Sequence, residues 1–258
     1  MSPSPQAVIR LQGVSKVFPD VPPGTPPALS SLTADVPSGL VVGLVGPDAA
    51  GKTTLMRLLA GLLLPTSGSV EVLGRVPGSE ASDEAVHDVG YMPQRFGLYE
   101  DLSVIDNLNL HAELRGLEGP ARQAMFEKLL TFTALKPFTD RLAGKLSGGM
   151  KRKLMVCRAL LTGPEILLLD EPTAGMDALS RRQMWNLLRK LNEKNLTILL
   201  TTHYMEEAEI LCDKIYMMHK GEFIAYGSCE ELKNNYNTNS LRDIFIKLAS
   251  ERGDLIEE

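Results

Sequence analysis

Residues 40–53 read LVVGLVGPDAAGKT, and they determine the fold class that the sequence predicts. The run over 40–45 is continuously apolar apart from one glycine, which is typical of a strand covered on both faces. Leucines then recur at helical spacing, which predicts a helix over 52–63. A strand, a glycine turn and a helix follow in this order, so the stretch opens an α/β unit.

The turn of this unit fits the pattern G-x-x-x-x-G-K-[ST], which predicts a phosphate-binding loop. Glycine lets the backbone approach phosphate closely, and the amides at a helix N-terminus attract an anion. Lys52 can reach the β- and γ-phosphates, and the Thr53 hydroxyl can hold Mg²⁺. The alternative is a plain glycine turn, which would not need Lys-Thr in this register. The predicted nucleotide-binding residues are Gly46, Pro47, Asp48, Ala49, Ala50, Gly51, Lys52, Thr53 and Thr54.

A second apolar run, over 166–169, ends in two acidic residues, Asp170 and Glu171. In open α/β sheets, ligands bind at the carboxyl ends of the strands. We predict that Asp170 holds Mg²⁺, directly or through water, and that Glu171 polarises the attacking water. The alternative is a strand that leaves the sheet through an acidic turn. The phosphate loop earlier in the chain favours the catalytic interpretation.

Residues 146–150, LSGGM, predict the start of another helix. Ser147 can cap this helix, and Gly148 and Gly149 leave its first amides bare. The segment is therefore a second helix N-terminus that suits phosphate. A simple cap is the alternative, and the residues alone do not say whose phosphate the segment would contact.

The rest of the chain alternates between strands and helices around one helical stretch. We predict strands over 8–11, 29–36, 165–169, 196–201 and 215–218, and helices over 180–192 and 205–211. Helical signals dominate from Ser103, which begins an S-x-x-[DE] capping pattern, to about Leu161, with clear periodicity over 122–135. A polar turn over 234–239 precedes a short helix near 241–248. The alternation favours a parallel sheet with an inserted helical lobe.

Composition and charge exclude several classes of protein. The 258 residues carry 27 Lys and Arg against 32 Asp and Glu, a net charge of −5 that gives no overall attraction to nucleic acid. Three cysteines without a C-x-x-C pair indicate neither a disulfide framework nor a zinc site, which fits a reducing compartment. The sequence has no signal peptide and no apolar run of about 18 residues. We therefore expect a soluble chain that reaches a membrane only through a partner.

Six motifs occur in the order GPDAAGKT, YMPQ, LSGGM, ILLLDE, AGMD and TTH. Together they resemble the ATP-binding subunit of an ABC transporter, over nearly the whole chain. LYEDLSVIDNL, LSGGMKRKL and THYMEEAE resemble the multidrug-efflux and ABC-2 export branch. The resemblance implies an α/β P-loop NTPase fold, in which an ABC-type core has a mostly parallel sheet, flanking helices and an N-terminal antiparallel part. It places the core of this 1–258 domain at 1–94 and 164–235, a helical subdomain at 95–163 and a helical tail at 236–258.

The resemblance also implies roles for single residues. Phe18 would stack on adenine, Gln94 would contact Mg²⁺ and sense the γ-phosphate, and His203 would contact the γ-phosphate and support the attacking water. Asp177 would couple two nucleotide sites. Without the family, Phe18 would be a core phenylalanine, Gln94 a polar loop residue and His203 a structural histidine. The implied catalytic set is Glu171, His203, Gln94 and Lys52, and the implied metal ligands are Thr53, Gln94 and Asp170.

The family implies that two such domains, identical or different, close head to tail with ATP and Mg²⁺ as cofactors. Each Ser147–Gly149 segment would then meet ATP held on the partner's phosphate loop, and hydrolysis would loosen the interface. The remaining implied partners are transmembrane permease subunits, with no nucleic acid, and the location is cytoplasmic on the inner face of the cell membrane. Residues 95–102 are the candidate docking surface, unless Phe96, Leu98 and Tyr99 only pack against the helical lobe.

Two positions depart from the usual family pattern. Ala49 replaces a common glycine, at a cost of about 1 kcal/mol if φ is positive there, and Met150 replaces a common Gln. Because the implied catalytic residues remain, we expect hydrolysis. A non-transport ABC ATPase in DNA repair or translation, or a non-hydrolysing regulatory module, are the alternatives. His87, His111 and His219 match no motif and are expected to be surface or packing residues.

Overall fold

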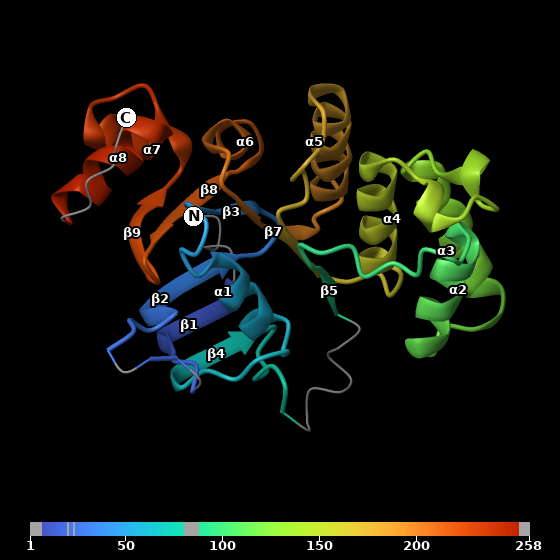
Figure 1. The fold of residues 1–258 in the computed structure, drawn as a ribbon, viewed down its shortest axis with the longest axis horizontal. Coiled ribbons are helices and arrows are strands. Elements are labelled where there is room, and N and C mark those ends of the chain that lie inside the picture. Colours follow the sequence, from blue (N-terminus) through green and yellow to red (C-terminus); the bar gives the residue numbers. More distant parts are fainter. Residues whose placement is uncertain (1–6, 20, 23, 80–87, 253–258) are drawn as a thin grey trace, which may run out of the picture. The chain divides into compact units, whose positions relative to one another are not determined.

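The computed structural model describes residues 7–19, 21–22, 24–79 and 88–252. The chain forms two compact units, shown as a ribbon in Figure 1. The first unit comprises residues 1–83 and 197–258, and the second comprises residues 84–196. The predicted helical subdomain, 95–163, lies within the second unit, and the predicted domain boundaries themselves stay a prediction. His87 lies outside the described residues.

An antiparallel sheet occupies the N-terminal part of the first unit, as predicted. Its strands are β1 (Ala7–Lys16), β2 (Leu29–Pro37) and β4 (Ser67–Val72), in the order β2-β1-β4. Alternate residues of β2 are buried, which is the pattern of a strand with one face on the core. β1 is longer than predicted. β4 was not predicted, because SGSVEV begins with small polar residues that carry no strand signal.

A second group of strands in the first unit carries the phosphate loop. β3 (Val41–Val45) pairs in parallel with β7 (Thr197–Thr202) on one side and with β8 (Lys214–His219) on the other. β3 and β7 are buried at every residue, as their continuous apolar runs predict. The unpredicted β9 (Glu222–Gly227) pairs antiparallel with β8 through a hairpin. Lys220 and Gly221 both have positive φ in this hairpin, as a tight two-residue turn requires.

Four helices complete the described part of the first unit, namely α1 (Lys52–Leu59), α6 (Met205–Leu211), α7 (Cys229–Tyr236) and α8 (Leu241–Glu251). α1 ends earlier than predicted, just before Gly61 at φ 70. The predicted polar turn over 234–239 is wrong for its first three residues. They belong to α7, which a capping box of Ser228 and Glu231 starts and Asn237, at φ 59, ends.

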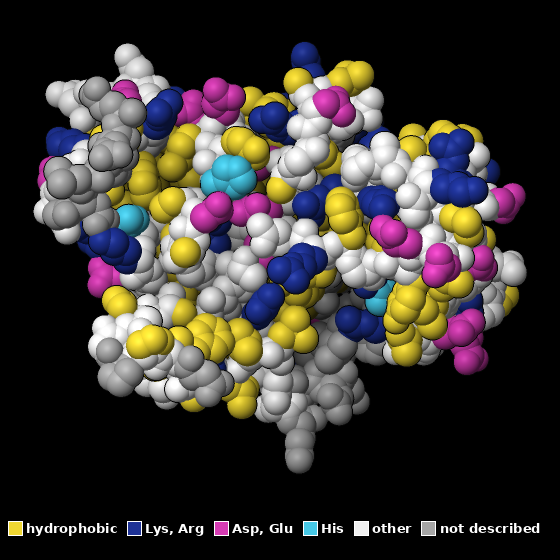
Figure 2. Space-filling view, in the orientation of Figure 1, with side chains coloured by type: hydrophobic (Ala, Val, Ile, Leu, Met, Phe, Trp, Pro, Cys, Tyr) yellow, Lys and Arg dark blue, Asp and Glu magenta, His cyan; other side chains and the backbone are white. Residues whose placement is uncertain are grey.

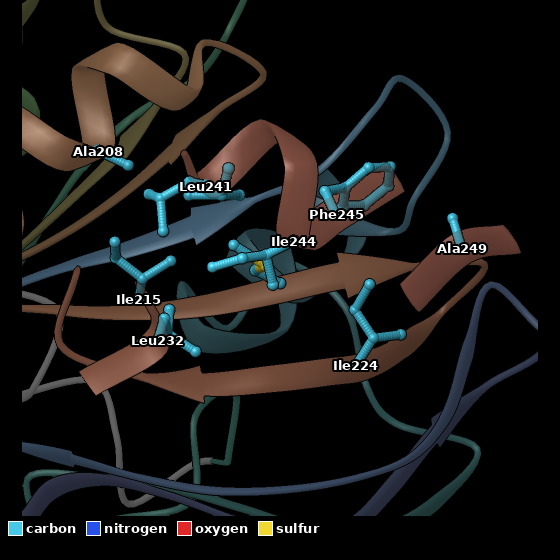
Figure 3. Packing of buried hydrophobic residues seen from close by; sticks show 10 residues of the cluster. Ala208, Ile215, Ile224, Leu232, Leu241, Ile244, Phe245 and Ala249 are labelled. Carbon is cyan, nitrogen blue, oxygen red and sulfur yellow. The ribbon is translucent and has the colours of Figure 1, made fainter. Parts of the chain in front are cut away.

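The C-terminal helices pack on the parallel strands of the first unit. Figure 3 shows the cluster, in which Ile215 of β8 and Ile224 of β9 lie close to side chains of α7 and α8. Leu232 contributes from α7, and Ile244 and Phe245 contribute from α8. Burial of such apolar side chains gives about 1.5–3 kcal/mol each. The predicted helix near 241–248 therefore anchors the chain's end to the sheet that carries the phosphate loop.

The second unit combines one parallel strand pair with helices. β5 (Val89–Met92) pairs in parallel with β6 (Ile166–Asp170). The helices of the unit are α2 (Val104–Leu114), α3 (Gly119–Phe132), α4 (Gly148–Leu160) and α5 (Ala178–Asn192), with short 3₁₀ turns at 136–138 and 143–145. Ser103 accepts a hydrogen bond from the Asp106 backbone amide, so it caps α2 as predicted. Among the described residues, no helix has the length and apolar character needed to cross a membrane.

Candidate functional site

The phosphate loop joins β3 to α1 at a place with no room for side chains at its two glycines. A Cβ at Gly46 would overlap the backbone oxygen of Met218, and one at Gly51 would lie 2.6 Å from the Ala28 oxygen. Gly51 also has φ 103, a conformation that favours glycine. The Gly221 amide donates to the Ala50 oxygen at 3.0 Å, so the β8–β9 hairpin holds the loop. The glycines of the pattern are thus required by close packing in this fold.

Ala49 lies in the left-handed region, at φ 61. The condition for the predicted cost is therefore met, and it amounts to about 1 kcal/mol relative to glycine. Its neighbours hold the turn, since the Ala50 amide donates to the Pro47 oxygen at 3.3 Å. The alanine therefore lowers the stability of the loop, and the hydrogen bond from the Ala50 amide to the Pro47 oxygen is still made.

Lys52 is the buried cation of the loop. Lys52 is only 5% exposed. Its ammonium donates to the backbone oxygens of Gly46 and Pro47, both at 2.7 Å. Thr53 and Thr54 follow in the first turn of α1, at the N-terminal end of the helix. The positive end of the helix dipole and the ammonium therefore act on the same side of the loop.

His203 leaves the sheet beside the phosphate loop. β3 and β7 are parallel neighbours in which Val45 pairs with Thr202, and the Gly46 amide donates to the Thr202 oxygen at 3.3 Å. The next residues, Gly46 and His203, therefore leave the same edge of the sheet side by side. The ring of Tyr204 lies 4.1 Å from the imidazole, centroid to centroid. This geometry brings a predicted γ-phosphate contact to the loop that would hold the phosphate.

The predicted acidic pair lies at the carboxyl end of β6 in the second unit. Every residue of β6 is buried, and Asp170 ends it with no exposed surface. Glu171 follows and is 7% exposed. Because Met92 pairs with Leu169 in register, Gln94 leaves β5 at the same edge. Its Nε2 donates to Glu171 Oε2 at 3.0 Å, which joins two of the predicted catalytic residues.

Glu171 has an unusual backbone conformation, with φ 50. A residue with a side chain rarely adopts this region, and such strain costs on the order of 1–3 kcal/mol. The Ala174 amide donates to the Glu171 oxygen at 3.2 Å, so a tight turn follows the strand at once. This turn fixes the direction in which the carboxylate leaves the sheet.

Arg152, on α4, is a residue of this site that the sequence did not identify. It is 5% exposed, and its guanidinium donates to the Gln94 oxygen at 2.8 Å and to the Ala174 oxygen at 3.4 Å. Burial lowers the pKa of Arg152, and the negative charges of Glu171 and Asp170 act in the opposite direction. Arg152 therefore holds two backbone segments, one at Gln94 and the other in the turn that follows Glu171. In the sequence it is the middle of three adjacent basic residues, and nothing there marks which one faces inward.

For the ATP hydrolysis that the family resemblance implies, replacing Arg152 with Met should lower turnover about tenfold, because hydrogen bonds from a charged donor contribute about 1.5–3 kcal/mol. The Kd for ATP should change less than about twofold, since Arg152 contacts the chain and acts as a positioning residue. Arg152→Lys should recover part of the loss. Lys153→Met is the matched control, because Lys153 donates to the exposed Gln183. Steady-state rates and equilibrium ATP binding separate the two quantities, and an equal loss in both would contradict the positioning role.

The segment Leu146–Met150 starts α4 as predicted. Ser147 accepts from the Met150 amide at 3.3 Å, and Gly148 has open space around it. A Cβ at Gly149 would lie 3.2 Å from Ser180 Oγ, so this helix start lies against the start of α5. The two glycines therefore serve different purposes, because one leaves amides accessible and the other allows close packing.

Asp177 caps α5 in the same region. Its carboxylate accepts from the Ser180 amide at 2.9 Å and from the Ser180 hydroxyl at 2.6 Å. These hydrogen bonds hold the pKa of Asp177 below its ordinary value. The predicted coupling residue thus stands next to the predicted second phosphate-contacting segment, and its role stays a prediction.

The structure also describes the surroundings of Phe18, the predicted adenine contact, and of residues 95–102, the predicted docking surface. Phe18 follows β1, is 36% exposed and has the Lys16 ammonium 5.5 Å from its ring centroid. Phe96 lies with its ring 4.7 Å from the Arg152 guanidinium, so this residue of the predicted docking surface packs on α4. Tyr99 is 57% exposed. Adenine stacking by Phe18 and docking on 95–102 stay predictions.

The predicted ligands of Mg²⁺ are all oxygen donors, which suits this ion. Thr53 belongs to the first unit, and Gln94 and Asp170 belong to the second. On the one face of the molecule that Figure 2 draws, Lys and Arg side chains are mixed with Asp and Glu side chains. Lys52 and the N-terminus of α1 supply local positive potential for a polyphosphate, although the net charge of the chain is −5.

Comparisons with known proteins agree on one kind of relative. The profile of the family described as ABC transporter matches residues 29–174. The Escherichia coli (strain K12) protein named Probable multidrug ABC transporter ATP-binding protein YbhF is 51% identical over 227 residues, which cover 88% of this chain and 38% of that protein. The Burkholderia lata protein named Nod factor export ATP-binding protein I is 40% identical over 224 residues, which cover 87% and 72%. The chain thus spans less than half of the Escherichia coli relative.

Two solved structures have the same fold. One, described as an ATP binding subunit of an ABC transporter, has a TM-score of 0.82 and 26% identity and covers 94% of this chain and 99% of its own. The other is a dimeric ATP-binding cassette in a post-hydrolysis state, bound to ADP and Pi. It has a TM-score of 0.76 and 26% identity, and covers 85% of this chain and 98% of its own. The predicted α/β P-loop fold is therefore confirmed.

Proposed function

This chain belongs to the ABC transporter family as an ATP-binding domain, and on that premise we propose that it binds and hydrolyses ATP to drive an exporter. The observation that carries the proposal is the hydrogen bond between Gln94 Nε2 and Glu171 Oε2, at 3.0 Å, at the carboxyl end of β6. A regulatory module that only binds nucleotide would not require a carboxylate held in this way. The glutamate is instead suited to orient and polarise a water molecule.

In the proposed reaction, the phosphate loop binds the β- and γ-phosphates through its amides and Lys52. Glu171 accepts a hydrogen bond from the attacking water, whose oxygen bonds to the γ-phosphorus as the bond to the β–γ bridging oxygen breaks. The products are ADP and phosphate, and the water's proton leaves through Glu171. His203 donates to the γ-phosphate. Mg²⁺, when bound near Thr53, Gln94 and Asp170, supplies charge that offsets the negative charge of the phosphates.

The assembly that we propose contains two ATP-binding domains and transmembrane permease subunits. An exposed α4 N-terminus at Ser147 and Gly148 supports contact with nucleotide held by a second domain. We place the chain on the inner face of the cell membrane, where the permease would hold it. The relatives' names, which mention multidrug transport and Nod factor export, support export over a role in DNA repair or translation. The cargo that we propose is a drug or another hydrophobic compound.

The purified chain should release phosphate from ATP only when Mg²⁺ is present. Its specific rate should rise with protein concentration, because the proposed site is completed by a second copy. A phosphate-release assay on the full chain, over a hundredfold range of concentration and with EDTA as the control, tests both expectations. ATP binding without turnover at every concentration would instead favour the regulatory alternative. Copurification with a permease tests the export assignment separately.

A further inference from the structure

The turn between β7 and α6 places the ring of Tyr204 against that of His203. His203 is the first residue after β7, and Tyr204 is the residue from which α6 begins. The centroids of the two rings lie 4.1 Å apart, and the ring planes are tilted by 43°. Aromatic rings attract each other through dispersion and through their quadrupoles. The tyrosine ring therefore contacts the imidazole and limits the rotamers that it can adopt.

The backbone of Tyr204 is held from both sides of the turn. Its amide donates to Oγ1 of Thr202 at 3.0 Å, and Thr202 is buried in β7. Its carbonyl oxygen accepts from the Glu207 amide at 3.1 Å and from the Ala208 amide at 3.4 Å. These hydrogen bonds tie the turn to β7 at one end and to α6 at the other. The tyrosine ring therefore starts from a fixed backbone position, from which it can orient its neighbour.

Tyrosine is an unfavourable residue for the start of α6 itself. Ser, Thr, Asp and Asn are preferred at this position of a helix, because their side-chain oxygens accept from a backbone amide of the first turn. Five other helices of the chain follow this preference and begin at Ser103, Ser147, Asp177, Ser228 and Ser240, each of which accepts such a hydrogen bond. The side chain of Tyr204 makes no capping bond to α6. A residue that departs from a local preference beside an assigned catalytic group indicates a functional reason for the choice.

We infer that Tyr204 is a positioning residue, which holds the imidazole of His203 in the orientation that ATP hydrolysis requires. The inference rests on the proposed function, in which His203 contacts the γ-phosphate. The Gly46 amide donates to the Thr202 oxygen, so the backbone that leads to His203 is already tied to the phosphate loop. The side-chain torsions of His203 are then the freedom that contact with the Tyr204 ring restricts. A misoriented catalytic group lowers the rate more than the affinity for substrate.

Tyr204→Ala should lower kcat for ATP hydrolysis about tenfold, because the imidazole is no longer held. The Kd for a slowly hydrolysed ATP analogue should change less than about twofold. Tyr204→Phe should recover most of the rate, since it keeps the ring and removes only the hydroxyl. Tyr226→Ala is the matched control, because it removes another exposed tyrosine ring, which stacks on Tyr216 at 4.2 Å between centroids. Phosphate release at saturating ATP and equilibrium binding measure the two quantities.

Tyr204→Ser distinguishes orientation of the imidazole from stabilisation of α6. Because serine can cap the helix, Tyr204→Ser should melt at a higher temperature than Tyr204→Ala. The two variants should nevertheless have the same reduced kcat, since neither has a ring to place against His203. If kcat instead follows the melting temperature, so that serine restores the rate, Tyr204 acts only through the stability of α6 and the inference is wrong.

The orientation of His203 can also be measured without turnover, by NMR of the full chain labelled at histidine. Its signals are assigned by their loss in His203→Gln, and three-bond couplings across its side chain report the rotamer at χ1. We expect one rotamer in the unaltered chain and in Tyr204→Phe, and averaged couplings in Tyr204→Ala and Tyr204→Ser. One rotamer in the alanine variant, or an unchanged kcat, overturns the inference. A chain that releases no phosphate contradicts the proposed function instead, and the couplings then still decide whether Tyr204 orients His203.

Discussion

Glu171→Gln is expected to lower ATP turnover by at least about a hundredfold, because general-base catalysis contributes about 10² to 10⁴ in rate. The substitution keeps the size of the side chain, and the amide oxygen can still accept from Gln94 Nε2. ATP should therefore bind almost as before, and the complex should stop ahead of hydrolysis. The mass of the chain with ATP and Mg²⁺ should then rise to that of a dimer, as measured by light scattering.

The matched control for this experiment is Glu165→Gln. Glu165 is exposed and directly precedes β6, so the same chemical change is made at the opposite end of the same strand. Its turnover should equal that of the unaltered chain. Unchanged turnover in Glu171→Gln, or the lack of an ATP-dependent dimer in that variant, would count against both the assigned base and the proposed assembly.

Lys52→Met is expected to weaken ATP binding by about a hundredfold and to abolish measurable turnover at millimolar ATP. A charged hydrogen bond contributes about 1.5–3 kcal/mol, and the lysine can make more than one such bond to the phosphates. Methionine keeps the aliphatic stem, so the packing of α1 is preserved. The loss of hydrogen bonds to Gly46 and Pro47 should add a small decrease in melting temperature.

Arg57→Met is the control for the lysine variant, because Arg57 is an exposed cation in the last turn of the same helix. Calorimetric titration with a slowly hydrolysed ATP analogue measures the affinity of each variant, and thermal melting measures its stability. If Lys52→Met binds the analogue within about threefold of the unaltered chain, the ammonium does not contact phosphate. A loss confined to melting temperature would assign Lys52 to the structure of the loop alone.

Among the strands that the sequence predicts, β2 is buried only at alternate residues, whereas the strands with the most continuous apolar runs are buried on both faces. β3, β6 and β7 have this property at every residue. The unpredicted β5, VGYM, is four residues long and contains Gly90. Glycine lowers strand propensity, and the reason for it here is the close approach of α4, which is a tertiary contact. No local pattern carries that information.

Some residues of the site can be predicted from a local sequence pattern, whereas others depend on tertiary packing. The glycine and lysine positions of the phosphate loop follow from a spacing that has a direct physical cause. The pairing of Gln94 with Glu171 follows from strand register, which a single sequence does not fix. Arg152 was not predicted because its role depends on how α4 is rotated against the turn that follows β6. His111 was expected to be a surface or packing residue, and only its buried Nε2, which has no hydrogen-bond partner among the described residues, distinguishes it.

The positive φ angles of Ala49 and Glu171, 61 and 50, place two residues with side chains where the backbone alone would favour glycine. The cost in folding free energy is about 1 kcal/mol at Ala49 and on the order of 1–3 kcal/mol at Glu171. A laboratory selection for heat resistance alone would therefore reward glycine at both positions. At Ala49 that gain is compatible with the phosphate-loop pattern, but at Glu171 it removes the assigned base. The same gain in heat resistance would thus have opposite consequences for activity at the two positions.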